Sequence, residues 1–355
     1  MTPLALQAVT PAALCAAVPA LTLAEARKVV AMVHRGEAVR PTSAVRRVAA
    51  EAVVAAGAVP TLTVCERQAS ALDPFEKLVV AGPDGARFET VRIPLAHPGR
   101  VSVCVSSQVG CALACAFCAT GRLGLRRNLE TWEIVEQVRL VRATLAPGQR
   151  VHGVVFQGMG EPMANLDRVL AAIAVLTDPC AQGVDARAIT VCTSGHPGGI
   201  RRLAEAAPNV RLGLSIASAR PEVRRSLMPI DRAHPLDELL AAAADHARLT
   251  GLAPMWAVTL LAGVNDGPDD AAALAERAAA FTAATGVRPR LSVLAYNPIG
   301  PGDPFARASD ETMAAYRAVL SSHGLASHRR YSGGSDIAAA CGQLAADRHA
   351  DVTGP

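Results

Sequence analysis

From residue 101 onward the sequence alternates between short apolar runs and longer stretches with the apolar periodicity of helices. Strands are predicted over 101–106, 152–156, 188–192, 211–216, 254–261 and 290–294, and each is followed by a predicted helix. Repeated strand–helix units form parallel sheets, because the helix returns the chain to the edge where the strand began. Six units are fewer than a closed barrel needs, so we predict an α/β fold, an incomplete (βα)6 barrel. The loops after the strands would carry its chemistry.

Two smaller regions precede the barrel, which is expected to span 98–355. A helical accessory domain is predicted over 1–72, where Thr22 followed three residues later by Glu25 indicates a capped helix over 22–34. A second helix is predicted over 42–56. This region is the more basic end of the chain, and both RNA contact and ordinary exposed helix faces remain open. Apolar runs at 77–81 and 88–93 predict a β-hairpin extension over 73–97. Helices over 310–323 and 336–346 are predicted to close the chain.

The composition gives no sign of a membrane-spanning protein. Hydrophobic residues make up 51% of the chain but aromatic residues only 3%. The most apolar early stretch, 8–23, contains Pro11 and Pro19 and follows no basic residue, so it fits neither a signal peptide nor a spanning helix. We therefore expect a cytoplasmic protein without membrane contact, whose nine cysteines serve metal binding or catalysis. The net charge of +4 indicates a nucleic-acid partner only weakly.

Cys111, Cys115 and Cys118 form a C-x3-C-x2-C spacing on a loop of small residues after the first predicted strand. Cysteine thiolates hold iron–sulfur clusters, and a four-iron cluster normally takes four of them. Three close thiolates without a fourth beside them would hold three irons and leave the last iron open to a chelating ligand. A structural zinc site and ordinary buried cysteines are the alternatives. Zinc needs four N or S ligands, however, and this stretch contains no histidine.

This spacing resembles the radical S-adenosylmethionine (SAM) superfamily, in which SAM chelates the open iron of a 4Fe-4S cluster. Further motifs follow in the order CVSSQVGCALACAFCATG, FQGMGEPMANLD, GVNDG, YNPIGPG and DIAAACGQLA. Together, over about residues 72–346, they are similar to the RlmN/Cfr family of radical SAM RNA methyltransferases. Within that family the likeness is to side-branch members rather than to RlmN itself. Members place a methyl group on an aromatic carbon of adenosine in ribosomal RNA.

The resemblance implies a reaction that uses two SAM molecules per turnover and a pair of cysteines. C2 and C8 of adenine are electron-poor and do not attack the methyl group of SAM, so a protein thiol carries that group. Cys341 matches the methyl carrier, and Cys104 matches the resolving thiol that frees the product by forming a disulfide bond. Both sulfurs must come within disulfide reach, so the last helix must bring Cys341 to the barrel mouth. Glu89 matches the residue that accepts a proton from the base.

Three positions match the family's SAM contacts. Gly160 and Glu161 form a turn where the backbone can approach the ligand and a carboxylate can accept from the methionyl ammonium. Asn297 matches a contact on the adenosine side of SAM, although an Asn before a proline is also an ordinary turn residue.

Two further SAM positions depart from the family pattern. The family's Ser-Thr-Ser-Gly begins here with Cys192, so a thiol, the weaker hydrogen-bonding group, replaces a hydroxyl. The family's Ser-Leu-His becomes Ser215, Ile216 and Ala217, which removes an imidazole. The segment before Cys341 is also altered, to Gly-Gly-Ser-Asp. These changes leave the cluster and thiol motifs intact and bear on SAM affinity and the RNA target.

The predicted activity is methylation of C2 or C8 of an adenosine, in 23S ribosomal RNA, by a monomer that takes electrons from a reductant such as flavodoxin or ferredoxin. Two alternatives remain open. One is a radical SAM enzyme of the same scaffold that acts on a peptide or small molecule, and the other is a non-catalytic iron–sulfur RNA-binding protein. Arginines that could contact phosphate, or form a solvated face, are Arg122, Arg126, Arg127 and the pairs Arg201/Arg202, Arg224/Arg225 and Arg329/Arg330.

Overall fold

A computed structural model describes residues 3–300 and 302–345, and its centre is a ten-stranded sheet of order β14-β13-β12-β11-β10-β9-β6-β5-β4-β3. Neighbouring strands from β6 to β14 run parallel, whereas those from β3 to β6 run antiparallel. This open α/β sheet confirms the predicted partial barrel. Its strands are β3 (Thr63–Ala69), β4 (Glu76–Ala81), β5 (Arg87–Pro94), β6 (Arg100–Val105), β9 (Arg150–Phe156), β10 (Ile189–Thr193), β11 (Arg211–Ser215), β12 (Met255–Leu260), β13 (Arg290–Ala295) and β14 (Ser327–Arg329).

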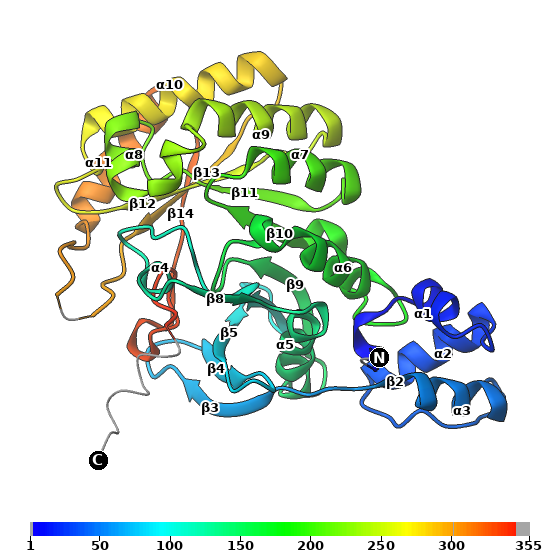
Figure 1. Cartoon of the computed structure of the whole chain (residues 1–355). Coiled ribbons are helices and arrows are strands. Elements are labelled where there is room, and N and C mark those ends of the chain that lie inside the picture. The colour runs from blue at the N-terminus through cyan, green and yellow to red at the C-terminus, as the bar shows by residue number, and fades with distance from the viewer. Residues whose placement is uncertain (1–2, 301, 346–355) are drawn as a thin grey trace.

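Helices connect the parallel strands, and Figure 1 shows α7, α9 and α10 along the outside of β11, β12 and β13. Each buries an apolar stripe, such as Ile200 and Leu203 of α7. None of the helices in the described ranges has the length and apolar character to cross a membrane. The helices of this part are α4 (Ala119–Arg122), α5 (Thr131–Ala143), α6 (Leu166–Thr177), α7 (Pro197–Ala206), α8 (Pro221–Leu227), α9 (Leu236–Thr250), α10 (Pro268–Thr285) and α11 (Asp310–Ser322).

Several short elements lie in the connections. After β6 the chain forms a small hairpin whose two strands enclose the cysteine loop and α4. These elements are β7 (Gln108–Gly110), β8 (Leu125–Asn128) and the 3-10 turns η2 (Pro162–Asn165), η3 (Ala186–Ala188) and η4 (Pro229–Arg232).

The predicted hairpin forms as β4 and β5, and it has a third strand, β3, that the sequence did not reveal. The polar run in β3, Thr63–Ala69, pairs only along one edge and carries a register shift between Val64 and Glu66. Because β5 pairs with β6, the extension continues the barrel sheet. Residues within the predicted accessory region therefore contribute to the main sheet, and the domain limits at 72 and 97 stay a prediction.

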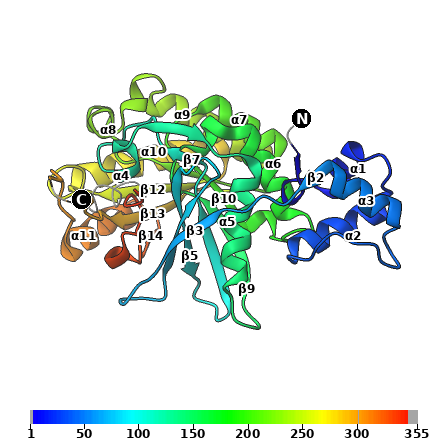
Figure 2. The same cartoon turned by 60° about the horizontal axis from the view of Figure 1, so that its bottom comes forward.

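The N-terminal helices form a separate group beside α5 and α6 (Figures 1 and 2). The capped helix forms as predicted, with Thr22 and Glu25 hydrogen-bonding each other's backbone amides. The second helix starts at Arg47 rather than at 42, because residues 42–45 form a turn closed by a bridge between Thr42 and Val45. The elements are β1 (Leu4–Ala5), η1 (Leu6–Ala8), α1 (Pro11–Ala17), α2 (Leu23–His34), α3 (Arg47–Ala56) and β2 (Gly57–Ala58).

The helix predicted over 336–346 is wrong within the described residues, and Ala346 lies outside them. The only regular element there is the 3-10 turn η5 (Ser335–Ile337), and the chain then runs irregularly to Ala345. Left-handed backbone at Gly334, Ala338 and Gly342, with φ of 73°, 49° and 86°, interrupts any helix. Cys341 therefore sits in a turn. A seventh parallel strand, β14, precedes this segment and was also not predicted.

Candidate functional site

A cavity of about 210 Å³ opens at the carboxyl ends of the parallel strands. Residues at or beyond the ends of β6, β9, β10, β11, β12 and β13 line it, together with the cysteine loop and the segment after β14. Loops at this edge of a parallel sheet are where α/β barrels carry their chemistry. The cavity is therefore the candidate active site.

The cysteine loop supplies Cys111, Cys115 and Cys118, and all three line the cavity. The loop is held in place locally, because the Cys111 amide donates to the Gly124 carbonyl at 2.9 Å and the Cys118 amide to the Cys115 carbonyl at 3.1 Å. Gly110, just before it, has φ of 76°, and a side chain there would lie 1.8 Å from that same Gly124 carbonyl oxygen. Glycine is therefore required for the loop to close.

Glu161 joins two of the loops around the cavity. One carboxylate oxygen accepts from the Met163 amide at 3.0 Å, and the other accepts from the Ser194 amide at 3.0 Å. Burial raises the pKa of Glu161 to about 7, although both amides oppose the shift. Gly160 before it has φ of 97°, and a side chain there would meet Gln108 at 2.5 Å. The turn thus holds one buried carboxylate at the cavity wall.

Arg224 holds the loops after β10 and β11 in place. The sequence did not predict this role. Its guanidinium is fully buried, pairs with Asp231 at 3.0 Å and donates to the carbonyls of Ser194, Ser215 and Ile216. The grouping of Arg224 with surface arginines was therefore wrong. A buried cation needs such partners to offset its desolvation. Here they fix two of the loops that carry predicted SAM positions.

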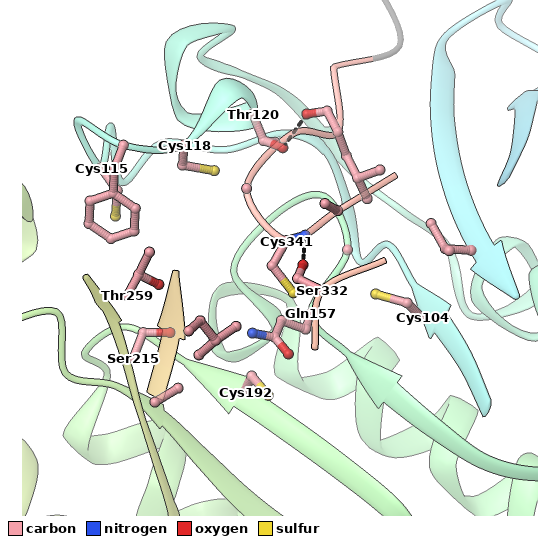
Figure 3. A pocket seen from close by; sticks show the side chains of 18 of the residues that line it. Cys104, Cys115, Cys118, Thr120, Gln157, Cys192, Ser215, Thr259, Ser332 and Cys341 are labelled. Carbon is pink, nitrogen blue, oxygen red and sulfur yellow. Dashed lines mark hydrogen bonds between the residues drawn. The ribbon is translucent and has the colours of Figure 1, made fainter. Parts of the chain in front are cut away.

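Three thiols from distant parts of the chain face the same cavity, as Figure 3 shows. Cys104 lies near the end of β6, Cys192 on β10 and Cys341 after β14. In Figure 3 the sulfur atoms of Cys104 and Cys341 point toward each other across the cavity. All nine cysteines, each within the described ranges, are free, so the predicted disulfide is absent from this state of the molecule. The arrangement nonetheless brings together the two cysteines predicted to act as a pair.

Arg330 supplies positive charge beside these thiols. It donates to the Gln157 side-chain oxygen at 3.0 Å, and its second terminal nitrogen is buried without a hydrogen-bond partner in the described residues. The neighbouring Cys341, then Cys192 and Cys104, raise the pKa of Arg330. Burial raises the pKa of the Cys104 thiol to about 12, and the charge of Arg330 offsets part of this rise. Arg330 thus favours the thiolate forms of Cys104 and Cys192 against the effect of burial.

Side-chain hydrogen bonds hold the segment that carries Cys341. The Cys341 amide donates to the Ser332 hydroxyl at 2.9 Å, and the Asn297 amide donates to the Cys341 carbonyl at 3.2 Å. The Ala119 amide donates to the Gly342 carbonyl at 2.7 Å, and the Thr120 hydroxyl donates to Leu344 at 2.6 Å. The segment that carries Cys341 is therefore tied to α4, directly after the cysteine loop, although it forms no helix itself.

Glu89 does not line the cavity. It is buried on β5 and pairs with Lys77 of β4, with 2.9 Å between nitrogen and oxygen and both side chains 1% exposed. Lys77 also donates to the carbonyl of Ala338, in the Cys341 segment, at 3.4 Å. The pair thus lies beneath that segment, on the strand face that presents Val91 and Ile93 to the cavity.

Some of the other predicted SAM positions line the cavity and others do not. Gly160, Glu161, Cys192, Ser215 and Ala217 line the cavity. Ile216 and Asn297 are not among the lining residues. Ile216 is buried, and Asn297 hydrogen-bonds the lining residues Cys341 and Ser332. Polar lining residues that the sequence did not reveal include Gln157, Ser194, Thr259, Tyr296, Arg330 and Ser332.

Comparison with known proteins gives this geometry a context. Residues 105–275 match the model of the radical SAM superfamily. A probable RNA methyltransferase of Sorangium cellulosum is 58% identical over 346 residues, which cover 92% of this chain and 88% of that relative. The chain belongs to the RlmN/Cfr family of radical SAM RNA methyltransferases. It is accordingly a SAM-dependent methyltransferase.

Further relatives agree with the RlmN/Cfr assignment. A dual-specificity RNA methyltransferase RlmN of Syntrophobacter fumaroxidans is 41% identical and covers 74% of each chain. A probable RNA methyltransferase of Myxococcus xanthus is 38% identical and covers 94% of this chain and 91% of its own. The crystal structure of a radical SAM methyltransferase from Sphaerobacter thermophilus superposes with a TM-score of 0.86 at 33% identity, covering 97% of this chain and all of that one.

Membership in the family implies a 4Fe-4S cluster and SAM, and the residues present fit both. The three loop thiols are free and share one cavity with the Glu161 carboxylate. Burial raises the pKa of the Cys111 thiol to about 12 and raises that of Cys115 and Cys118 as well, so metal binding must displace their protons. In the described residues, no three His, Cys, Asp or Glu side chains converge on a single ion. A four-iron cluster gives each thiolate its own iron, so convergence on one point is not required.

Proposed function

We propose that this enzyme methylates C2 or C8 of an adenosine in 23S ribosomal RNA, with Cys341 as methyl carrier and Cys104 as resolving thiol. The observation that carries the proposal is the meeting of both thiols with the three loop cysteines in one cavity. A structural zinc site or a structural iron–sulfur site would need only the loop cysteines. A second, separate pair of thiols has a use when one thiol carries the methyl group to an electron-poor carbon and the other releases the product.

The loop cysteines Cys111, Cys115 and Cys118 would hold the cluster, and Glu161 would accept from the ammonium group of SAM. When bound, the cluster supplies the electron for reductive cleavage of SAM, whereas a second SAM in each turnover supplies the methyl group. Arg224 fixes the backbone of the loops after β10 and β11 that would receive SAM. Asn297 would act through the Cys341 segment as well as on SAM.

The thiol pair carries the group-transfer steps. The Cys341 sulfur takes the methyl group from one SAM. The 5′-deoxyadenosyl radical that cleavage of the second SAM would release takes one hydrogen atom from that methyl group, and the carbon becomes bonded to the adenine ring. The unpaired electron left on the adduct would return to the cluster when the ring proton leaves. Glu89 is the proposed acceptor of the ring proton, and its partner Lys77 would stabilise the carboxylate. The Cys104 sulfur then attacks the Cys341 sulfur, a disulfide forms, and the carbon–sulfur bond breaks with its electron pair on carbon, which takes a proton. A reductant restores both thiols before the next turnover.

Two kinds of observation support RNA as the substrate. The relatives from Sorangium, Myxococcus and Syntrophobacter are all named as RNA methyltransferases. Their matches also reach into the N-terminal helices, since 92% and 94% of this chain are covered in two of them. Action on ribosomal RNA would place the protein in the cytoplasm, as a monomer served by a one-electron donor such as flavodoxin or ferredoxin.

The Cys104→Ala variant tests the proposal. Without the resolving thiol the product cannot leave, so the variant purified anaerobically should carry covalently attached RNA that nuclease digestion reduces to a nucleotide on Cys341. Cys180→Ala is the matched control, because Cys180 is a free cysteine outside the cavity, and it should carry no adduct.

A Cys104→Ala protein with full iron content but no RNA adduct would contradict an RNA substrate. A peptide or small molecule attached to Cys341 in its place would favour the same scaffold with a different substrate. Mass spectrometry of ribosomal nucleosides from a deletion strain would then distinguish 2-methyladenosine from 8-methyladenosine.

A further inference from the structure

Tyr331 is exposed, whereas the other aromatic residues are buried or half-buried. The sequence has two Trp, three Tyr and six Phe residues, all within the described ranges. Tyr296 and Tyr316 are 1% and 2% exposed, whereas Tyr331 is 67% exposed. No other aromatic residue in those ranges is exposed. A Tyr side chain combines a flat apolar face with a polar tip, which suits it to a binding surface when it is exposed.

The position of Tyr331 is specific. It lines the catalytic cavity, close to Ser332 and Cys341, and it also lines a second cavity of about 120 Å³. Arg307 and Arg329 are among the residues of that second cavity. The ring thus stands at the boundary between the thiols and a basic recess.

The ring is also held in one orientation. Its hydroxyl donates to Asp73 at 2.7 Å, and the same carboxylate oxygen accepts from the Gly334 amide at 2.9 Å. Phe75 packs against it edge-on, with ring centroids 6.2 Å apart and planes at 70°. A fixed ring loses little conformational freedom when a ligand stacks on it, which favours binding.

The charge of the second cavity is only partly neutralised. Arg329 pairs with Asp310 at 2.6 Å. Arg307 is exposed, donates to the Tyr296 carbonyl and the Asn297 side chain, and has no carboxylate partner among the described residues. Arg330, which lines both cavities, also has no carboxylate partner among the described residues and donates to Gln157. Arg224, which fixes the loops after β10 and β11, is paired with Asp231. Arg307 is therefore suited to a phosphate.

We propose that Tyr331 stacks on the base adjacent to the target adenosine, and that Arg307 binds the phosphate of that nucleotide in the second cavity. This inference rests on the proposed function. Its ligand is single-stranded RNA, because a planar face beside an unpaired guanidinium complements a base and its phosphate together. An adenosine that enters the cavity leaves its neighbours unstacked, and Tyr331 replaces one of the lost stacking contacts.

Binding of RNA to the full-length protein with reconstituted cluster tests the proposal. The probe is a fluorescein-labelled uridine oligonucleotide with one central adenosine, and anisotropy gives the affinity. Tyr331→Ala and Tyr331→Leu should each bind about tenfold more weakly or worse, since both lose the aromatic face. Tyr331→Phe should keep most of the affinity. Leu72→Ala is the matched control, because Leu72 is 70% exposed on the neighbouring loop but has no ring, and it should bind as the wild type does.

Two further measurements separate stacking and phosphate contact from general effects. The flanking nucleotides of the probe are replaced one at a time by abasic sites. At one position the Tyr331→Ala variant and the wild type should then bind the probe with equal affinity, because the base that stacks on the ring is missing. Arg307→Met should lower the slope of log affinity against log salt by about 0.7, the value for one phosphate on a single strand. Arg329→Met should change the slope less, since Asp310 already neutralises that charge.

Equal affinities for wild type, Tyr331→Ala and Tyr331→Leu would overturn the proposal, as would a Tyr331→Ala deficit that no abasic site removes. The same holds if Arg307→Met leaves the salt slope unchanged. In these cases RNA adducts of the Cys104→Ala protein would still form, so the proposed function would stand. If neither RNA binding nor an adduct is detected for any variant, the proposed function itself fails.

Discussion

The loop cysteines and the thiol pair lie in one cavity but are specified in different ways. Cys111, Cys115 and Cys118 lie within eight residues of one another on a loop closed by its own backbone hydrogen bonds. Cys104 and Cys341 come from β6 and from the irregular segment after β14, and meet only because the whole sheet is in place. The first set is a local property of the sequence, and the second is a property of the fold.

This difference explains what holds each set. The loop needs glycines at positions such as Gly110, where a side chain would strike the Gly124 carbonyl. The Cys341 segment needs Ser332, which precedes Cys341 by nine residues, and Asn297, which follows β13 and is 44 residues away. Damage to the loop should therefore abolish the cluster. Damage around Cys341 should leave the cluster and disturb only methyl transfer.

The largest expected effect is that of Cys115→Ala. Loss of one of three ligands should remove most bound iron and all methylation, because the loop itself has no fourth cysteine to replace it. Iron analysis and the absorbance of the anaerobically reconstituted protein measure this. Cys180→Ala should bind iron normally. Full iron content in Cys115→Ala would show that the loop is not the cluster site.

Cys341→Ala should abolish methylation equally but retain the cluster. The methyl carrier is lost, whereas the backbone hydrogen bonds of residue 341 to Ser332 and Asn297 do not depend on its side chain. Iron content, and methyl incorporation from labelled SAM into RNA, measure the two properties separately. Residual methylation would mean that another residue carries the group, and Cys192 would then be the nearest candidate.

Asn297→Ala should slow methyl transfer by about 10- to 100-fold without loss of iron. The substitution removes hydrogen bonds to the Cys341 carbonyl and the Ser332 hydroxyl, and small displacements of reacting groups cost rate on this scale. Single-turnover kinetics with saturating SAM isolate this positioning effect from weaker SAM binding. An unchanged rate would argue that the segment is held well enough without Asn297.

The smallest expected effect is the contribution of Glu161 to the way the free energy of unfolding changes with pH. Burial raises its pKa from 4.5 to about 7, so between these values the unfolded chain is ionised while the folded one stays protonated. In cluster-free protein its contribution to the free energy of unfolding should therefore fall as pH rises from 4.5 to about 7. Glu161→Gln should lack this component, as urea unfolding across the range would reveal. If the free energy of unfolding varied with pH in the same way for both proteins, Glu161 would make no such contribution.

The parts of the fold that the sequence predicted are those with strong local signals. Six parallel strands, their helices and the Thr22 cap all carry apolar periodicity or capping residues. Strand β14 has only the residues Ser-His-Arg, and β3 is polar with a register shift, so neither shows an apolar strand pattern. The Ala-rich run before Cys341 favours a helix by propensity, but the amides of Ala338 and Ala339 bond to Ser335 and Gly334 in a tight turn. The carbonyl of Ala338 accepts from the distant Lys77 instead of from a helical amide.

The site shows the same division. The loop cysteines, the Gly160–Glu161 turn and the thiol pair could be predicted from the sequence. Each lies in a short stretch that matches a motif of the family. Arg224 and Arg330 were grouped with surface arginines, since burial of a charged side chain depends on partners such as Asp231 and Gln157 that only the fold brings close. The position of Glu89 beside Lys77, beneath the Cys341 segment, likewise depends on strand pairing.

The most direct test of the account is the disulfide formed in one turnover. The wild-type holoenzyme is allowed to methylate ribosomal RNA once without a thiol reductant, free thiols are alkylated, and peptides are mapped by mass spectrometry. The account predicts a disulfide between Cys104 and Cys341 in amounts equal to methylated RNA. Methylated RNA with both cysteines still free, or with Cys341 joined to Cys192, would contradict it.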